Sequence, residues 1–561
     1  MAFFTSFCGA KSRTVLLVGF LSLTNVAFAQ TDTNAGVPDP GQISASGSLP
    51  DTNGAATNSP IAATNEISTP GQTAPTLTIT TPSGEPGTDP VSFQAESSFG
   101  SNFSMPAVCA LFALMSLGGF LLYQCGLTRA KNSGHTSALL LIGALFALTG
   151  YWIGGFGVQA GGIGDAHAAL TQPIPHAERG VLDHELGFLA FGHHWGLMGS
   201  SGFFLATDRL NRNGVAGLFL IQASLLAISI AAALGAALER GKVLAIAFCA
   251  FLFGFLIYPL LANWVWGGGW LAEMGREFQL GNGFVDLGGA AVVHETAGVL
   301  ALVIAVVLGP RHGRFGRNTA ANAIPGHNVP FFVLGSLILL VSWMASNALS
   351  SVNLSVDPEE APSVSAAALA AVNTLLAAMG GTIASVILAA VKKRRPEPAW
   401  ICRGLLGGAV ASCGCAGLID PWAAFLIGVV AGLLIQQAIL FLEHKRIDDP
   451  VGAAAVHGVS GAWGALAVGL FADGADGGGV NGVASPVRGL FYGGAWHQLA
   501  AQVIGIVTTF AVTCLLSYAC VNLVQKILGN RVTLAEETDG LDLSQVGALG
   551  YQGDVDPNPQ D

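Results

Sequence analysis

The sequence predicts an all-α membrane protein in which eleven transmembrane helices follow a polar N-terminal segment. Hydrophobic residues make up 52% of the chain and charged residues only 10%, whereas an ordinary soluble domain is about a quarter charged. Glycine is abundant, at 75 residues, and small residues let helices pack closely in lipid. The expected partner is therefore a lipid bilayer. No basic patch with interleaved aromatic residues favours a nucleic acid.

The N-terminal segment has two parts. Residues 1–29 have the pattern of a signal peptide: Lys11 and Arg13 precede an apolar run, and Ala27-Phe28-Ala29 offers a small-x-small cleavage site. An uncleaved anchor is the alternative. Residues 30–100 are rich in Thr, Ser, Pro and Gly. Such a composition cannot bury a core, so a disordered, low-complexity extracytoplasmic segment is expected.

The membrane domain is expected over residues 101–528, with a cytoplasmic C-terminal tail over 529–561. Each apolar run in the domain is long enough for a spanning helix of about 20 residues. The eleven expected spans are 105–128, 136–158, 213–237, 243–266, 284–308, 328–349, 364–391, 402–419, 421–442, 451–471 and 498–525.

The distribution of Lys and Arg predicts the orientation. With the mature N-terminus outside, the inner loops and tail hold 16 of these residues and the outer loops hold 5, as the positive-inside rule requires. This favours a bacterial-type inner (plasma) membrane with a cytoplasmic C-terminus. The fifth span then runs inward and the tenth outward. Spans 1–5 and 6–10 are thus candidates for an inverted 5+5 repeat, with one extra helix added.

Two stretches repeat one pattern in these opposed spans. Residues 286–298 and 449–461 each begin with Asp, reach a His after seven residues, and end with a Gly four residues later. Ionisable residues inside a membrane span are costly, so they are candidates for function. Two such residues in matching positions suggest one site at a repeat interface.

The repeated histidines are His294 and His457. Burial disfavours a charged imidazole, but two neutral rings can satisfy one another, because one nitrogen donates and the other accepts. Such a pair suits a small neutral or proton-exchanging solute. The alternative is a pair of packing histidines.

Asp286 and Asp449 are expected to cap helix starts, and Asp286 is also placed to favour a cation at the outer mouth. Nearby tryptophans at 264, 266 and 270 present faces that attract cations such as ammonium, although interfacial Trp is often only a membrane anchor.

From about residue 105 to 550 the chain resembles the ammonium transporter family, the Amt/Mep/Rhesus group. The resemblance rests on several motifs: Gln124-Cys-Gly-Leu-Thr-Arg-Ala-Lys-Asn132, Trp264-Val-Trp-Gly-Gly-Gly-Trp270, Phe284 through His294, Ile324-Pro-Gly-His-Asn-Val-Pro330, Arg446 through Gly461 and Gly540-Leu-Asp-Leu-Ser544.

The resemblance implies an eleven-helix homotrimer with one pore in each subunit and ammonium or ammonia as substrate. It implies that His294 and His457 are the twin histidines of the pore and form its proton relay. Trp266 matches the external cation-π residue, Ser350 the hydroxyl that binds ammonium there, and Asp286 an essential aspartate near that site. A cytoplasmic regulatory protein is a further candidate partner.

The chain also departs from the family. Two stacked phenylalanines usually close the outer pore, but Leu225 and Ser346 stand at those positions. This leaves room for a leakier conductor, another small amine, or an ammonium sensor of the same fold with little or no flux. Glu295 is a carboxylate where the family commonly has a small or neutral residue. It faces either a neighbouring helix or subunit, or exchanges protons with His294.

Three further features have competing interpretations. The outer loop 160–212 carries five histidines and is a candidate transition-metal site, but its spacing matches no ligand template. Cys413-Gly-Cys415 lacks the second pair of ligands that a zinc site needs. A membrane redox enzyme that binds haem or metal through the repeated histidines is disfavoured for the same reason. We therefore expect neither an enzyme nor a bound cofactor.

Overall fold

The computed structural model describes residues 107–163, 182–207, 209, 212–316, 321–351 and 364–551. The expected signal peptide and the expected disordered segment lie outside the described residues. Within them, ten helices are long and apolar enough to cross a membrane, and they are Ala107–Leu127, Ala130–Ala160, Arg212–Ala237, Val243–Phe278, Ala290–Leu308, Val329–Ser351, Ala366–Val391, Pro421–His444, Ala454–Phe471 and Trp496–Leu528. The predicted helical membrane fold is thus confirmed.

The eighth expected span, 402–419, differs from the prediction. Its helix, α15, is Pro398–Ser412, only 15 residues long, or about 22 Å at 1.5 Å per residue. The chain leaves the helix after Ser412 because the next carbonyls are used elsewhere. Cys413 O accepts from Gly288 N at 2.7 Å, and Gly414 O accepts from Leu287 N at 3.3 Å. The count of eleven spans remains a prediction.

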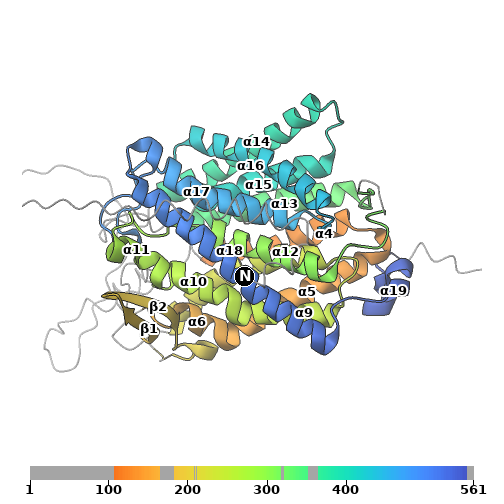
Figure 1. The fold of residues 1–561 in the computed structure, drawn as a ribbon, viewed down its shortest axis with the longest axis horizontal. Helices are drawn as coiled ribbons and strands as arrows, with labels where there is room; N and C mark the ends of the chain where they lie inside the picture. Colours follow the sequence, from red (N-terminus) through yellow and green to blue (C-terminus); the bar gives the residue numbers. More distant parts are fainter. Residues whose placement is uncertain are drawn as a thin grey trace, which may run out of the picture. The chain divides into compact units, whose positions relative to one another are not determined.

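Several of the spanning helices, Ala130–Ala160 and Val243–Phe278 among them, combine α-helical segments with short π-helical or 3-10 turns. Figure 1 labels each of these α-helices except α8: α4 Ser116–Leu127, α5 Ser133–Gly150, α6 Phe156–Ala160, α8 Arg212–Leu234, α9 Val243–Leu252, α10 Tyr258–Trp266, α11 Trp270–Phe278, α12 Thr296–Leu308, α13 Val329–Ser351, α14 Val364–Val391, α16 Pro421–His444, α17 Ser460–Phe471, α18 Trp496–Leu528 and α19 Leu534–Asp539.

Small residues allow the helices to approach closely. Helices α14, α15 and α16 pack against one another (Figure 1). A Cβ added to Gly428 of α16 would lie 1.9 Å from the carbonyl oxygen of Ala377 in α14. Helix α12 packs against α8 and α18 and against the π-helical turn Ala454–Val459 that precedes α17. The abundance of glycine in the sequence therefore corresponds to direct backbone contact between helices.

One end of the bundle, which we call the hairpin end, carries a two-stranded antiparallel sheet. Strand β1, Glu185–Ala190, pairs with β2, His193–Gly199. The turn between them has positive φ at Phe191 and Gly192, which suits a tight hairpin. Trp195 of β2 packs on Trp270 of α11, with ring centroids 5.5 Å apart. Figure 1 shows the hairpin beside α6, α10 and α11.

The other end, which we call the tail end, is held by a buried ionic network. The Arg311 side chain donates to both carboxylate oxygens of Asp448, at 2.8 and 3.0 Å, and to Glu239 Oε2 at 2.6 Å. Burial raises the pKa of Glu239, but the guanidiniums of Arg311 and Arg129 outweigh it and lower the pKa to about 2. The pKa of Asp448 is likewise raised by burial but lowered to about 2 overall, chiefly by its hydrogen bonds to Arg311.

The C-terminal segment packs against this tail end. Helix α19 begins with a capping box between Thr533 and Glu536. After it, Asp542 accepts a hydrogen bond from the backbone N–H of His135 at 2.8 Å. Arg531 Nη2 pairs with Glu537 Oε2 at 2.8 Å. The bond between His135 and Asp542 ties the segment after α19 to the start of α5.

Candidate functional site

The two repeated histidines meet in the middle of the bundle. His294 lies on the π-helical turn Ala290–Glu295, and His457 on the π-helical turn Ala454–Val459. Their Nδ1 atoms are 3.1 Å apart, and the rings are nearly parallel, with centroids 5.1 Å apart. The two side chains are only 1% and 3% exposed. At this distance one Nδ1 donates and the other accepts, so the pair shares one hydrogen.

Aromatic packing fixes the two rings. Trp343 of α13 is fully buried and presents its ring edge-on to both, with centroids 5.1 Å from His294 and 5.7 Å from His457. Phe120 of α4 lies 5.8 Å from the ring of His457. The imidazoles therefore have apolar neighbours apart from one another.

The two repeated aspartates cap the turns that carry the histidines. Asp286 accepts hydrogen bonds from three successive backbone N–H groups, those of Ala290, Ala291 and Val292, at 2.7–2.9 Å. Asp449 accepts from Gly452 at 3.2 Å and from Ala454 at 2.7 Å. The predicted capping is confirmed at both positions. Each carboxylate satisfies N–H groups that a helix start leaves without partners.

Trp266 lies next to Asp286 at the hairpin end of the site. It ends α10, and its Nε1 donates to the Asp286 carbonyl oxygen at 2.7 Å. This bond fixes the indole over the start of the His294 turn. Trp264 lies in the same helix and packs on Trp270, with ring centroids 5.8 Å apart. The structure thus brings together two of the three residues predicted to recruit substrate.

The third, Ser350, lies on α13. Its hydroxyl donates to the carbonyl of Ser346 at 3.0 Å, and the Ser346 hydroxyl donates to that of Trp343 at 3.1 Å. Among the described residues no hydrogen bond joins Ser350 to Trp266 or Asp286. Both serines therefore bond back within their own helix, and the assignment of Ser350 as a binding residue stays a prediction.

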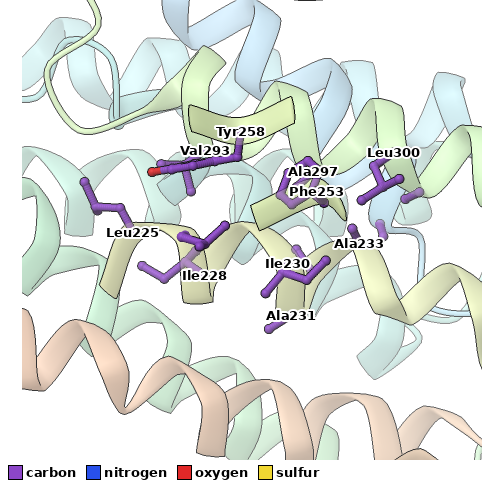
Figure 2. Close-up of a cluster of buried hydrophobic side chains, with 14 of the residues drawn as sticks. Leu225, Ile228, Ile230, Ala231, Ala233, Phe253, Tyr258, Val293, Ala297 and Leu300 are labelled. Atoms are coloured by element: carbon purple, nitrogen blue, oxygen red, sulfur yellow. The ribbon is translucent and has the colours of Figure 1, made fainter. Parts of the chain in front are cut away.

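Leu225, the other predicted gate position, is buried in an apolar cluster. Figure 2 shows it on α8 with Ile228 and Ile230, on the side of that helix that meets Tyr258, Val293 and Leu300. Its side chain is 3% exposed. A leucine here packs as core, and no aromatic stack is possible between Leu225 and Ser346.

A narrow cavity opens on the tail side of the histidine pair. It accommodates about one water-sized molecule. Its polar lining comes from Tyr123, Gln124 and His457, and its other lining residues are Phe120, Ala232, Val451, Gly452, Ala453 and Val456. Sequence reasoning gave no role to Tyr123 or Gln124. The motif that begins at Gln124 was the available signal.

Comparison with known proteins identifies the chain. A sequence profile described as the Ammonium Transporter Family matches residues 104–551, most of the chain. The chain belongs to the ammonium transporter family. The predicted resemblance is confirmed.

Individual members of the ammonium transporter family are similar in sequence to this chain over most of its length. The ammonium transporter Amt2 of Archaeoglobus fulgidus is 30% identical over 459 residues, which cover 80% of this chain and 88% of that protein. Amt1 of the same organism is also 30% identical, over 79% of this chain and 97% of that protein.

Solved structures share the fold. The structure named Sensor Amt Protein has a TM-score of 0.66 and 26% identity, and the match covers 81% of this chain and all of that one. Mep2 of Candida albicans, with a TM-score of 0.63 and 22% identity over 82% of this chain and 92% of that one, supports the fold alone.

The geometry of the site assigns no role to the buried carboxylate of Glu295. It is 2% exposed, and its Oε2 has no hydrogen-bond partner among the described residues. It shares the π-helical turn with His294. The structure records no contact between the two side chains.

The histidines of the outer loop do not form a metal centre in the described part of the chain, where no group of three or more potential ligands occurs. His167 and His176 lie outside the described residues. His193 Nδ1 contacts Glu277 Oε2 at 2.9 Å, and His194 Nε2 lies 3.8 Å from Glu185 Oε2. Cys413 and Cys415 are unpaired, and their thiols donate to carbonyls one turn earlier, so they behave as small core residues.

Proposed function

We propose that this protein is an ammonium transporter or ammonia channel that recruits external ammonium, removes a proton, and conducts ammonia past the histidine pair. The observation that carries the proposal is the 3.1 Å contact between two buried imidazoles beside a water-sized cavity. An apolar path rejects a hydrated cation, whereas neutral ammonia needs only a few small polar binding positions along the path. Potassium has a similar size but no proton to lose, so deprotonation supplies selectivity that size cannot.

In this proposal each residue has a distinct task. Trp266 offers an aromatic face to ammonium, and Ser350 offers a hydroxyl. Asp286 acts at a distance, because both of its carboxylate oxygens already accept backbone hydrogen bonds; its negative charge favours a cation at the mouth. His294 and His457 pass on the proton that ammonium gives up, while ammonia crosses. Proton and ammonia recombine on the tail side.

The proposed topology completes this picture. We infer that α15 is the eighth of eleven spans and that the two halves form an inverted repeat, since both halves build the same capped turn around a histidine. The mature N-terminus then lies outside and the tail end faces the cytoplasm of a bacterial-type cell. A homotrimer and a cytoplasmic regulatory partner belong to the same proposal, on the strength of the family alone.

The test is a current measurement. Purified protein is reconstituted in liposomes, and the current after an ammonium pulse is recorded on a supported membrane. We expect a saturable current in the wild type and its loss in His294→Ala. The matched control is His444→Ala, an exposed histidine at the end of α16, which should conduct as the wild type does. An undiminished current in folded His294→Ala would refute the relay.

A second candidate is ammonium sensing without efficient flux. Two observations favour it: Leu225 and Ser346 replace the gate phenylalanines, and one similar structure, matched over its whole length, is named a sensor. Binding of ammonium by calorimetry, with no current in the same preparation, would support sensing. A wild-type current above that of empty liposomes would favour transport.

A further inference from the structure

The cavity on the tail side of the histidine pair is lined by Gln124, a side chain with one hydrogen-bond acceptor that the fold leaves unused. Gln124 lies in the last turn of α4 and is completely buried. Its Nε2 donates to the carbonyl of Ala231 at 2.7 Å. Its Oε1 has no hydrogen-bond partner among the described residues. The side chain also lines the cavity that His457 borders.

The orientation of this amide is fixed by its environment. Ala231 is the fourth residue from the end of α8, Arg212–Leu234, which continues directly into the 3-10 turn Gly235–Ala237. The Gln124 amide donates to the Ala231 carbonyl oxygen in this last turn. Rotating the amide would place Oε1 against this carbonyl, acceptor against acceptor. The bond to Ala231 therefore accounts for the NH₂ group. It does not explain the oxygen, because an unpaired buried acceptor is destabilising.

The other residues that line the cavity limit which ligand could bind to Gln124 Oε1. The Tyr123 hydroxyl already donates to Val451 O at 3.1 Å, and Phe120, Ala232 and Val456 contribute carbon. A ligand for Oε1 must be about the size of water and must carry a hydrogen to donate. A neutral amide oxygen binds such a donor without the ion pair that a carboxylate would form. Conduction needs binding of that modest kind, since the ligand must also leave.

We propose that Gln124 Oε1 is a binding station for the conducted substrate, a small N–H donor, on the tail side of His457. This inference rests on the proposed transport function and adds a substrate contact to it. The station would hold ammonia after it passes the imidazoles, close to where the proton returns.

The experiment compares the wild type with Gln124→Met, which has a similar volume but neither donor nor acceptor. The matched control is Tyr123→Phe, which removes the neighbouring cavity hydroxyl and its bond to Val451. We expect Gln124→Met to lower the maximal ammonium current about fivefold, the effect of one net hydrogen bond, and Tyr123→Phe to lower it less. An unchanged maximal current in Gln124→Met would overturn the proposal.

A structural measurement keeps the test decisive if the variant folds poorly. High-resolution maps of the wild type are recorded with ammonium chloride and with sodium chloride. A peak within hydrogen-bond distance of Gln124 Oε1 only in ammonium supports the station. A peak in both salts would identify the bound molecule as water, and the absence of a peak in both salts would mean that nothing binds there. Either result would overturn the proposed binding station. A wild type without any current would instead refute the transport function itself.

Discussion

Replacing Arg311 with methionine should destabilise the fold strongly, because it leaves two buried carboxylates without their main cation. The side chain of Arg311 is nearly fully buried, and it hydrogen bonds to Asp448 through two nitrogens and to Glu239 through a third. Methionine keeps much of the volume and none of the charge. Breaking a buried ion pair from one side typically costs about 3–5 kcal/mol.

The lowered pKa values give an independent estimate. The pKa of Asp448 falls from its ordinary 3.8 to about 2, and that of Glu239 from 4.5 to about 2. At 1.36 kcal/mol for each unit of pKa, each carboxylate is stabilised by roughly 2–3 kcal/mol. Arg129 supplies part of this for Glu239, so the share of Arg311 agrees with about 3–5 kcal/mol.

The assay is thermal unfolding in detergent, followed by tryptophan fluorescence. At pH 7 a loss of about 3 kcal/mol should lower the melting temperature by about 6 °C in a large domain. The pKa values of both carboxylates are lowered by folding, so their stabilisation is complete above about pH 4.5 and is lost as the pH falls toward 2. The gap between wild type and Arg311→Met should therefore narrow at pH 3.

The control and the refuting outcome are direct. Arg395→Met changes an exposed arginine in the loop after α14 and should leave the melting temperature unchanged. If Arg311→Met melted within a degree of the wild type at pH 7, or if the gap were the same at pH 3, the network would not be the source of stability that its geometry indicates.

Three further predictions concern the site. Gly298→Ala should reduce the ammonium current and the melting temperature together, because the new Cβ would lie 2.0 Å from Gly458 N and force the two segments that carry the histidines apart. Asp286→Asn should lower stability by about 1 kcal/mol, since an amide can accept at only one of its two ends; unfolding in denaturant measures it. Trp266→Leu should raise the ammonium concentration for half-maximal current, as both the aromatic face and the bond to the Asp286 carbonyl are lost; an unchanged concentration would contradict recruitment at Trp266.

Sequence alone predicted the spans and the paired histidines for physical reasons. A spanning helix needs an apolar run of fixed length, and such runs are visible without any tertiary information. The partner of His294 was found because the chain contains its own second copy of the pattern at His457. The segment after Ser412 misled the prediction, since its small residues are apolar. The carbonyls of Cys413 and Gly414 accept hydrogen bonds from residues more than a hundred positions earlier.

The cavity could not be predicted for the same reason. Gln124 is polar and lies at the end of an apolar run, and a residue in that position is predicted from sequence to lie at the membrane surface. Its burial depends on the last turn of α8, 107 residues later, where its amide donates to a backbone carbonyl. Only the folded structure shows that the amide nitrogen is hydrogen bonded, that the amide oxygen has no partner among the described residues, and that the side chain lines a cavity of the size of the substrate.

The glycines of the repeated pattern explain why the two histidines can meet at all. Each lies four residues after its histidine, one helical turn further along. A Cβ on Gly298 would lie 2.0 Å from Gly458 N, and a Cβ on Gly461 would lie 2.3 Å from Ala290 O. Each glycine thus lets its helix touch the backbone of the other turn. At that separation two imidazoles from opposed helices come within one hydrogen bond, whereas an added methyl group on either side would separate them. The matched Asp, His and Gly therefore act as one unit: the aspartate starts the turn, the glycine sets the crossing distance, and the histidine occupies the crossing.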